Sequence, residues 1–266
     1  MKKHLSVFEL AARGAVYKTL AVSLCSAAAI FALLLPELDR GGALASRLEF
    51  PEGLSLTGAA PAALVYCAGI VLLYFLLCRS LAPKRGVNPD ATLRRLRVPE
   101  REAAYVQALV HALCFAVYMA LALAAYLGFA ALFLARSGPY ENNGQSLLFA
   151  AYCALPLHTL LPLASWREGL FAAATCLFCG AGSAAFAFWR RRGRTSGFGV
   201  AAGVLLVLTH FFRVGGDAHF VVVFLELGLA AAALIGAFRD TTADEREAAS
   251  AAALETQEGG GADATA

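Results

Sequence analysis

The chain has 266 residues, of which 59% are hydrophobic and 15% are charged, and its mean hydropathy is +0.65. A soluble domain carries about 25% charged residues, so this composition excludes an ordinary soluble fold. The formal net charge of +3 is small and unevenly placed, so it reflects membrane topology and indicates no nucleic acid as a partner. Several apolar runs approach the roughly 20 residues that cross a bilayer. We therefore predict an all-α, polytopic transmembrane helical bundle of about six spans, a multi-pass protein surrounded by the lipid bilayer of the cytoplasmic (inner) membrane.

Residues 1–18 combine basic and apolar residues, with apolar ones on one helical face. This pattern predicts an interfacial amphipathic helix that lies on the cytoplasmic leaflet. The apolar run over 19–35 predicts the first span. A secretory signal is the alternative, since residues 43–45 resemble a cleavage site, but Glu9 and the long apolar run favour a membrane span.

The next apolar run, 56–78, predicts a second span that follows an acidic, outward-facing loop. Residues 79–102 are strongly basic, and cytoplasmic loops carry an excess of lysine and arginine, so we expect this loop inside. The cluster that dominates it consists of Arg94, Arg95, Arg97 and Arg101. Pro99 marks the start of a long third helix with glutamates in its first turn, and we expect its span over 108–135.

Residues 146–163 are apolar enough to span the bilayer, but Pro156 and Pro162 interrupt them. The next span, 169–188, is followed by arginines within residues 190–194. If 146–163 crossed the membrane, these arginines would face outside, against the positive-inside rule. We therefore predict a re-entrant or interfacial segment over 146–163, with a crossing as the alternative.

Two further runs, 198–212 and 218–238, predict the fifth and sixth spans, so that the transmembrane domain extends over 19–239 and both termini are cytoplasmic. Small residues recur in both runs at four-residue spacing, as in Gly199 and Gly203. Such faces let helix backbones approach closely, so they are candidate interfaces of a homo- or heterodimer. Residues 240–266 predict a cytoplasmic tail that begins as a helix and ends disordered.

Glu226 lies about eight residues into the sixth span, roughly 12 Å from its outer end at 1.5 Å per residue. A carboxylate at this depth is costly unless it is paired or protonated, and it indicates a functional site by default. Its polar neighbours in the sequence pattern are His219, Arg213 and His210. Two interpretations stay open, namely a polar lining of a substrate or proton path and a structural ion pair that locks two helices.

Signatures of catalysis are scarce, since the sequence has neither a zinc-protease HExxH nor a nucleotide-binding Walker A motif. Cys176 and Cys179 form a CxxC inside an apolar run without an adjacent His or Asp, so we expect no metal and no cofactor there. The glycine-rich surroundings of Ser183 resemble those of the serine in intramembrane proteases, but no histidine is expected at comparable depth. We interpret His111 as a packing residue and predict that the chain is not an enzyme.

The order of parts resembles that of the membrane subunits of ABC-2-type transporters, with six spans, a basic loop between the second and third, and cytoplasmic ends. The segment over 92–101, TLRRLRVPER, is similar to the stretch that precedes the third helix in these permeases, on the side that faces the ATPase. Residues 157–163, LHTLLPL, are similar to a segment of uncharacterised membrane proteins of Clostridia-like Firmicutes. One departure is the interrupted segment between the third and fourth spans, because the re-entrant element of the family lies between the fifth and sixth.

The resemblance implies a permease-like subunit that moves a substrate across the membrane with energy from a separate ABC-type ATPase. The arginine cluster would then dock an acidic groove of that ATPase or anionic lipid. A non-transporting accessory or scaffold protein is the alternative, with Glu226 in a structural pair. An intramembrane enzyme is a more distant alternative.

Overall fold

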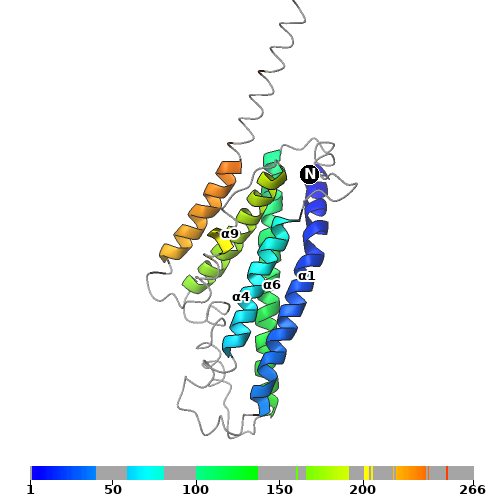
Figure 1. Cartoon of the computed structure of the whole chain (residues 1–266), viewed down its shortest axis with the longest axis vertical. Coiled ribbons are helices and arrows are strands. Elements are labelled where there is room, and N and C mark those ends of the chain that lie inside the picture. The colour runs from blue at the N-terminus through cyan, green and yellow to red at the C-terminus, as the bar shows by residue number, and fades with distance from the viewer. Residues whose placement is uncertain are drawn as a thin grey trace, which may run out of the picture.

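Five long helices make up nearly all of the part of the chain that the structure describes (Figure 1). The computed structural model describes residues 2–39, 59–80, 100–136, 166–191 and 220–237, together with 160, 201–203, 205, 218, 239 and 250. The helices are α1 (Lys2–Asp39), α4 (Ala59–Cys78), α6 (Glu100–Arg136), α9 (Trp166–Arg191) and a helix over Phe220–Ala237. Each contains a segment long and apolar enough to cross a membrane, and the described ranges contain no strand. The prediction of an all-α transmembrane bundle is therefore confirmed.

Helix α6 is the central helix of this bundle. It packs most extensively along α1 and α9, while α4 touches α1, α6 and α9. In Figure 1, α1, α4 and α6 run side by side, and α9 lies between them and the Phe220–Ala237 helix, drawn in orange. Long apolar helices without a strongly polar face pack in this way because small residues at the crossings let their backbones approach.

Pairs of contacting residues show that α1 and α4 run antiparallel. Gly14, early in α1, lies against Ser80 just after the end of α4, whereas Ser26, later in α1, lies against Gly69 in the middle of α4. The same reasoning applies to α4 and α6, since Tyr118 binds the first half of α4 and an earlier residue of α6 binds Ser80. Helices α1 and α6 therefore run in one direction and α4 in the other.

Helix α9 is antiparallel to α6. Met119 of α6 lies 3.6 Å from Cys176, while His111, earlier in α6, lies 2.8 Å from Ser183, later in α9. The connection between the two helices therefore begins and ends at the same end of the bundle. The segment over 146–163 lies outside the described residues except for Leu160, so its re-entrant character stays a prediction.

The Phe220–Ala237 helix runs parallel to α9. Trp166 at the start of α9 packs on Phe220, and Trp189 near the end of α9 packs on Gly236. The chain therefore returns to the opposite end of the bundle between these two helices. Of the expected fifth span over 198–212, only residues 201–203 and 205 are described, and they are helical.

The helix boundaries at the N-terminal side differ from the expected ones in one respect. Helix α1 is a single helix of 38 residues, so the boundary expected between an interfacial helix over 1–18 and a span over 19–35 is not a break. Lys18, at that point, donates hydrogen bonds to the carbonyls of Leu76 at 3.1 Å and Arg79 at 3.3 Å, so this part of α1 packs against the end of α4. At 1.5 Å per residue α1 is ~57 Å long and extends beyond the ~30 Å hydrocarbon core of a bilayer.

Helix α6 begins at Glu100, directly after Pro99, where the sequence places a helix start. Proline is favoured at the start of a helix because it has no amide hydrogen to leave unsatisfied. The rest of the basic loop, residues 81–99, lies outside the described residues. The same holds for the tail over 240–266, apart from Ser250.

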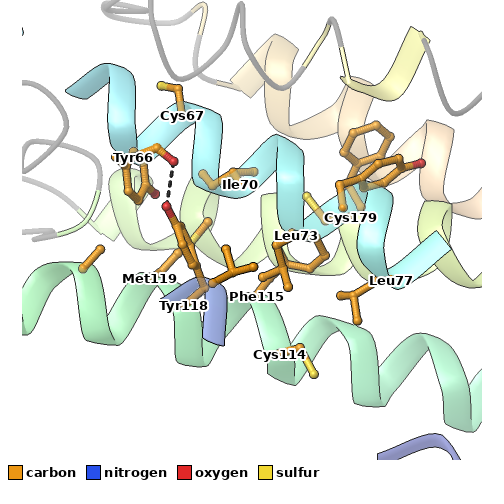
Figure 2. Packing of buried hydrophobic residues seen from close by; sticks show 14 of the residues in the cluster. Tyr66, Cys67, Ile70, Leu73, Leu77, Cys114, Phe115, Tyr118, Met119 and Cys179 are labelled. Atoms are coloured by element: carbon orange, nitrogen blue, oxygen red, sulfur yellow. Dashed lines mark hydrogen bonds between the residues drawn. The ribbon is translucent and has the colours of Figure 1, made fainter. Parts of the chain in front are cut away.

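Aromatic and branched side chains fill the space between α4, α6 and α9 (Figure 2). The rings of Tyr66 and Tyr118 stack with their centroids 5.7 Å apart, and the Tyr118 hydroxyl donates to the Tyr66 carbonyl at 2.8 Å. A Cβ at Gly69 would collide with that hydroxyl, so glycine is needed for α4 to approach this closely. The surrounding side chains include Ile70, Leu73, Leu77, Phe115 and Met119. This packing fixes the register of α4 against α6, and with it the position of Ser80 beside Gln107 and His111.

Candidate functional site

Glu226 is a carboxyl buried between two helices. It is 0% exposed and faces α9 from the Phe220–Ala237 helix. The Thr175 hydroxyl oxygen lies 3.2 Å and 3.0 Å from the two carboxyl oxygens, and Thr175 is also 0% exposed. The pair joins two parallel helices well inside both of them, where water is excluded.

The Thr175 hydroxyl has one proton to donate and three acceptor oxygens within hydrogen-bond distance. Its oxygen lies 3.0 Å from the Phe171 carbonyl, one turn earlier in α9, as well as within 3.2 Å of both oxygens of Glu226. A hydroxyl donates one hydrogen bond and accepts up to two. If it donates to Glu226, it stabilises the carboxylate; if it donates to Phe171, its oxygen can accept a hydrogen bond from the O–H of a neutral Glu226. The same geometry therefore satisfies both forms of the carboxyl.

Two thiols of α9, Cys176 and Cys179, lie close enough to interact electrostatically with the Glu226 carboxyl. No charged group in the described ranges lies this close to it. The other polar residues predicted for this site, His219, Arg213 and His210, lie outside the described residues. A structural ion pair between Glu226 and one of them therefore stays a prediction. What the structure brings to the carboxyl is Thr175, which the sequence pattern did not single out.

Of the four arginines of the predicted docking cluster, the structure describes Arg101, which is half-buried in the first turn of α6. Arg94, Arg95 and Arg97 lie outside the described residues. Arg101 belongs to one end of the bundle, where α1 and α6 begin and α4, α9 and the Phe220–Ala237 helix end. The described basic side chains at or near this end are Arg13, Lys18, Arg79, Arg101, Arg190 and Arg239, and the acidic ones are Glu9 and Glu102. We call it the basic end.

A second polar group, inside the bundle near the basic end, is centred on His111. Its Nδ1 lies 2.8 Å from the Ser183 hydroxyl of α9, and its Nε2 lies 3.2 Å from the Ser80 hydroxyl just after α4. The Gln107 amide donates to the same Ser80 oxygen at 3.4 Å. His111 and Ser183 are 0% exposed, whereas Ser80 is partly exposed. The three side chains thus form a hydrogen-bonded chain from the interior to the edge of the bundle.

The expectation that no histidine lies at the depth of Ser183 is wrong. Ser183 lies eight residues before the end of α9 and His111 eleven residues after the start of α6, and both of those helix ends lie at the basic end. Comparing distances from the helix ends, rather than from the ends of the apolar runs, would have placed the two side chains at similar depth. Their actual contact also depends on how the helices are rotated, which the sequence pattern did not show.

A hydroxyl beside an imidazole is the arrangement of an activated serine nucleophile. Here, however, Ser183 also donates to the Gly180 carbonyl at 3.2 Å, and both partners are completely buried. At Gly180 the backbone of α9 touches that of α6 so closely that a Cβ would lie 2.6 Å from the Ala108 carbonyl oxygen. The described conformation therefore has no room for a substrate at this serine. No cluster of three metal-ligating side chains occurs in the described residues either.

Comparison of the chain with protein-family models, curated proteins and solved structures gives no match. The five apolar helices indicate a multi-pass membrane protein, with a few polar groups buried among apolar side chains.

Proposed function

We propose that the protein is a permease-like subunit that moves a substrate across the cytoplasmic membrane. The observation that carries this proposal is the fully buried Glu226, whose partner in the described residues is a neutral hydroxyl and not a cation. A carboxyl in the membrane interior costs several kcal/mol when ionised, and such groups mark substrate or ion pathways. A residue that served only to join two helices would be replaced at lower cost by a small apolar side chain.

A separate ABC-type ATPase would supply the energy and bind at the basic end. Nothing in the sequence forms a phosphate-cradling loop, so nucleotide hydrolysis would be the partner's chemistry. Arginines from several helix ends lie there, and the basic loop over 81–99 connects two of these ends. By the positive-inside rule this end faces the cytoplasm, where an ATPase with an acidic groove, or anionic lipid, would meet it.

An accessory membrane protein that transports nothing is the second candidate. The hydrogen bond between Thr175 and Glu226 favours it, because this bond ties the Phe220–Ala237 helix to α9 through buried polar groups. In that case the carboxyl contributes to stability and has no role in moving a substrate.

Capture of partners tests the ATPase part of the proposal. The full chain is affinity-purified from its native membranes after mild cross-linking, and co-purifying proteins are identified by mass spectrometry. An ABC-type ATPase cross-linked through Lys84 or a neighbouring residue of the basic loop is the expected result. A preparation without any ATPase, under conditions that preserve a control transporter, would overturn this part.

Two variants separate a transport role of Glu226 from a structural one. In Glu226→Gln the amide oxygen still accepts the hydrogen bond from Thr175, but the group no longer ionises. Glu226→Leu removes both properties. A transport role predicts that Glu226→Gln folds with wild-type thermal stability and loses transport. Wild-type transport by Glu226→Gln, with instability confined to Glu226→Leu, would favour the accessory protein.

A further inference from the structure

We propose that Glu226 exchanges protons with the cytoplasmic side through Thr175 and Ser183 of α9, His111 of α6 and Ser80, which follows α4. This inference goes beyond the permease proposal, because it requires no ATPase and no particular substrate. It assigns a proton-binding site to the carboxyl and a proton-relay role to a histidine that looks like a packing residue in the sequence.

At the inner end of the route, Thr175 can form a hydrogen bond with both the protonated and the ionised form of Glu226. Rotation of the Thr175 hydroxyl between the Phe171 carbonyl and Glu226 changes it from an acceptor to a donor toward the carboxyl. Loss of the proton therefore leaves no orphaned hydrogen-bonding group, which would be costly in the membrane interior. A carboxyl held by a fixed N–H donor would instead leave the O–H of its neutral form without an acceptor.

The outer end of the route is a relay. His111 lies between two hydroxyls, Ser183 at 2.8 Å from Nδ1 and Ser80 at 3.2 Å from Nε2. Each hydroxyl donates or accepts, so both neutral tautomers of the imidazole are satisfied. A proton accepted on one ring nitrogen and released from the other crosses the imidazole without moving the ring. Ser80 is partly exposed, so it connects this relay to the solvent at the basic end.

The two ends are joined by α9 itself. Thr175, Cys179 and Ser183 recur at four-residue spacing on one helix face, and all three are 0% exposed. From Thr175 to Ser183 the face rises ~12 Å at 1.5 Å per residue. The buried Cys179 thiol lies between them. Because ~12 Å is more than one water molecule can span, this longest step of the route requires a transient file of about three water molecules beside the thiol.

The ionisable groups around the route are few. The thiols of Cys176 and Cys179 on α9 face the carboxyl, and no charged side chain among the described residues acts on it. Among the described residues, Lys18 of α1 is the charged group within electrostatic reach of His111. It also binds the carbonyl ends of α4, so it stays beside the relay. A change of charge at Glu226 therefore reflects its own proton.

Infrared difference spectroscopy of the full chain in lipid bilayers tests the proposal. A sudden change of pH is applied, and the C=O stretching band of a protonated carboxyl is followed in time. We expect a band that responds to pH and disappears in Glu226→Gln, but persists in Glu168→Gln, which removes another buried carboxyl. His111→Phe should slow the response about a hundredfold, the lower end of what a positioned acid–base group contributes, with the same end point.

A matched pair of serine variants tests the route. Ser183→Ala should slow the response, whereas Ser23→Ala should leave it unchanged, because the equally buried Ser23 lies on α1, off the route. If His111→Phe does not fold, His111→Gln replaces it, since an amide keeps both hydrogen bonds but relays no proton. The absence of a pH-dependent band that belongs to Glu226 would overturn the proton site. A response as fast in the His111 and Ser183 variants as in the wild type would overturn the route.

Discussion

His111 and Ser183 are 72 residues apart in the chain and 2.8 Å apart in the bundle. Their contact exists because Gly180, one turn before the serine, lets the backbone of α9 touch that of α6. A hydrogen bond between two fully buried side chains holds the crossing in register. The buried polar chain and the closest helix packing are thus parts of one feature.

Gly180→Ala should destabilise the bundle by about 1–3 kcal/mol, the usual range for overpacking a core. The added Cβ would lie 2.6 Å from the Ala108 oxygen and 2.7 Å from the Ala112 nitrogen, both backbone atoms that cannot rotate away. Gly228→Ala is the control, since nothing lies within 4 Å of its Cβ position and alanine favours a helix by up to ~1 kcal/mol. Thermal unfolding of both variants in one detergent measures the difference, and equal stability would contradict the close crossing.

Thr175→Val should cost about 1–3 kcal/mol, because a buried carboxyl then loses its hydrogen-bond partner. Thr175→Ser keeps the hydroxyl and should retain most of that stability. The free energy of unfolding is compared for the two variants and for each combined with Glu226→Leu. In the Glu226→Leu background, we expect Thr175→Val and Thr175→Ser to have the same free energy of unfolding. A difference that persists there would show that Thr175 stabilises the protein through another contact.

Lys18→Met should lower stability by about 1 kcal/mol, because the ammonium binds the last carbonyls of α4, where a positive charge offsets the helix dipole. Arg13→Met is the matched control on the same helix. Arg13 is 79% exposed and pairs with Glu9 at 3.5 Å, so its loss should change stability by less than ~0.5 kcal/mol. Chemical denaturation of both variants provides the comparison, and a larger effect at Arg13 would speak against the role assigned to Lys18.

Tyr118→Phe should cost about 1 kcal/mol, the usual net contribution of a buried hydrogen bond, since it removes the 2.8 Å bond to the Tyr66 carbonyl. Tyr126→Phe should be neutral or stabilising, because the buried Tyr126 hydroxyl has no hydrogen-bond partner among the described residues. Each change removes one phenolic oxygen from a tyrosine of α6. Their unfolding temperatures therefore isolate the value of the hydrogen bond, and a greater loss in Tyr126→Phe would reverse the assignment.

Cysteine labelling should place Trp166 and Arg79 on opposite sides of the membrane. Both residues are exposed, at the start of α9 and just after the end of α4, which lie at opposite ends of the bundle. In a chain whose seven native cysteines are replaced, a membrane-impermeant maleimide should label Trp166→Cys in whole cells and Arg79→Cys only after permeabilisation. Labelling of both positions from one side would contradict the helix directions. Labelling of Arg79→Cys in whole cells, and of Trp166→Cys only after permeabilisation, would show that the bundle has the opposite orientation in the membrane.

The apolar runs of the sequence were sufficient to predict an all-α bundle of membrane-length helices. Apolar runs must form hydrogen-bonded helices in a bilayer, since every backbone polar group has to be satisfied within the protein. For the same reason Glu226 stands out, because a carboxyl in such a run is costly. Pro99 likewise marked the start of α6, as the helix begins at the next residue.

The tertiary structure alone decided which polar groups meet. His111 faces Ser183, Thr175 faces Glu226 and Lys18 reaches the end of α4, although no pattern in the sequence pairs them. A soluble helix reveals its inner face through alternating polar and apolar residues, but a membrane helix is apolar on its lipid side as well as its buried side. Rotation and stagger of the helices are therefore set by close contacts such as that at Gly180, and these appear only when the helices are packed together.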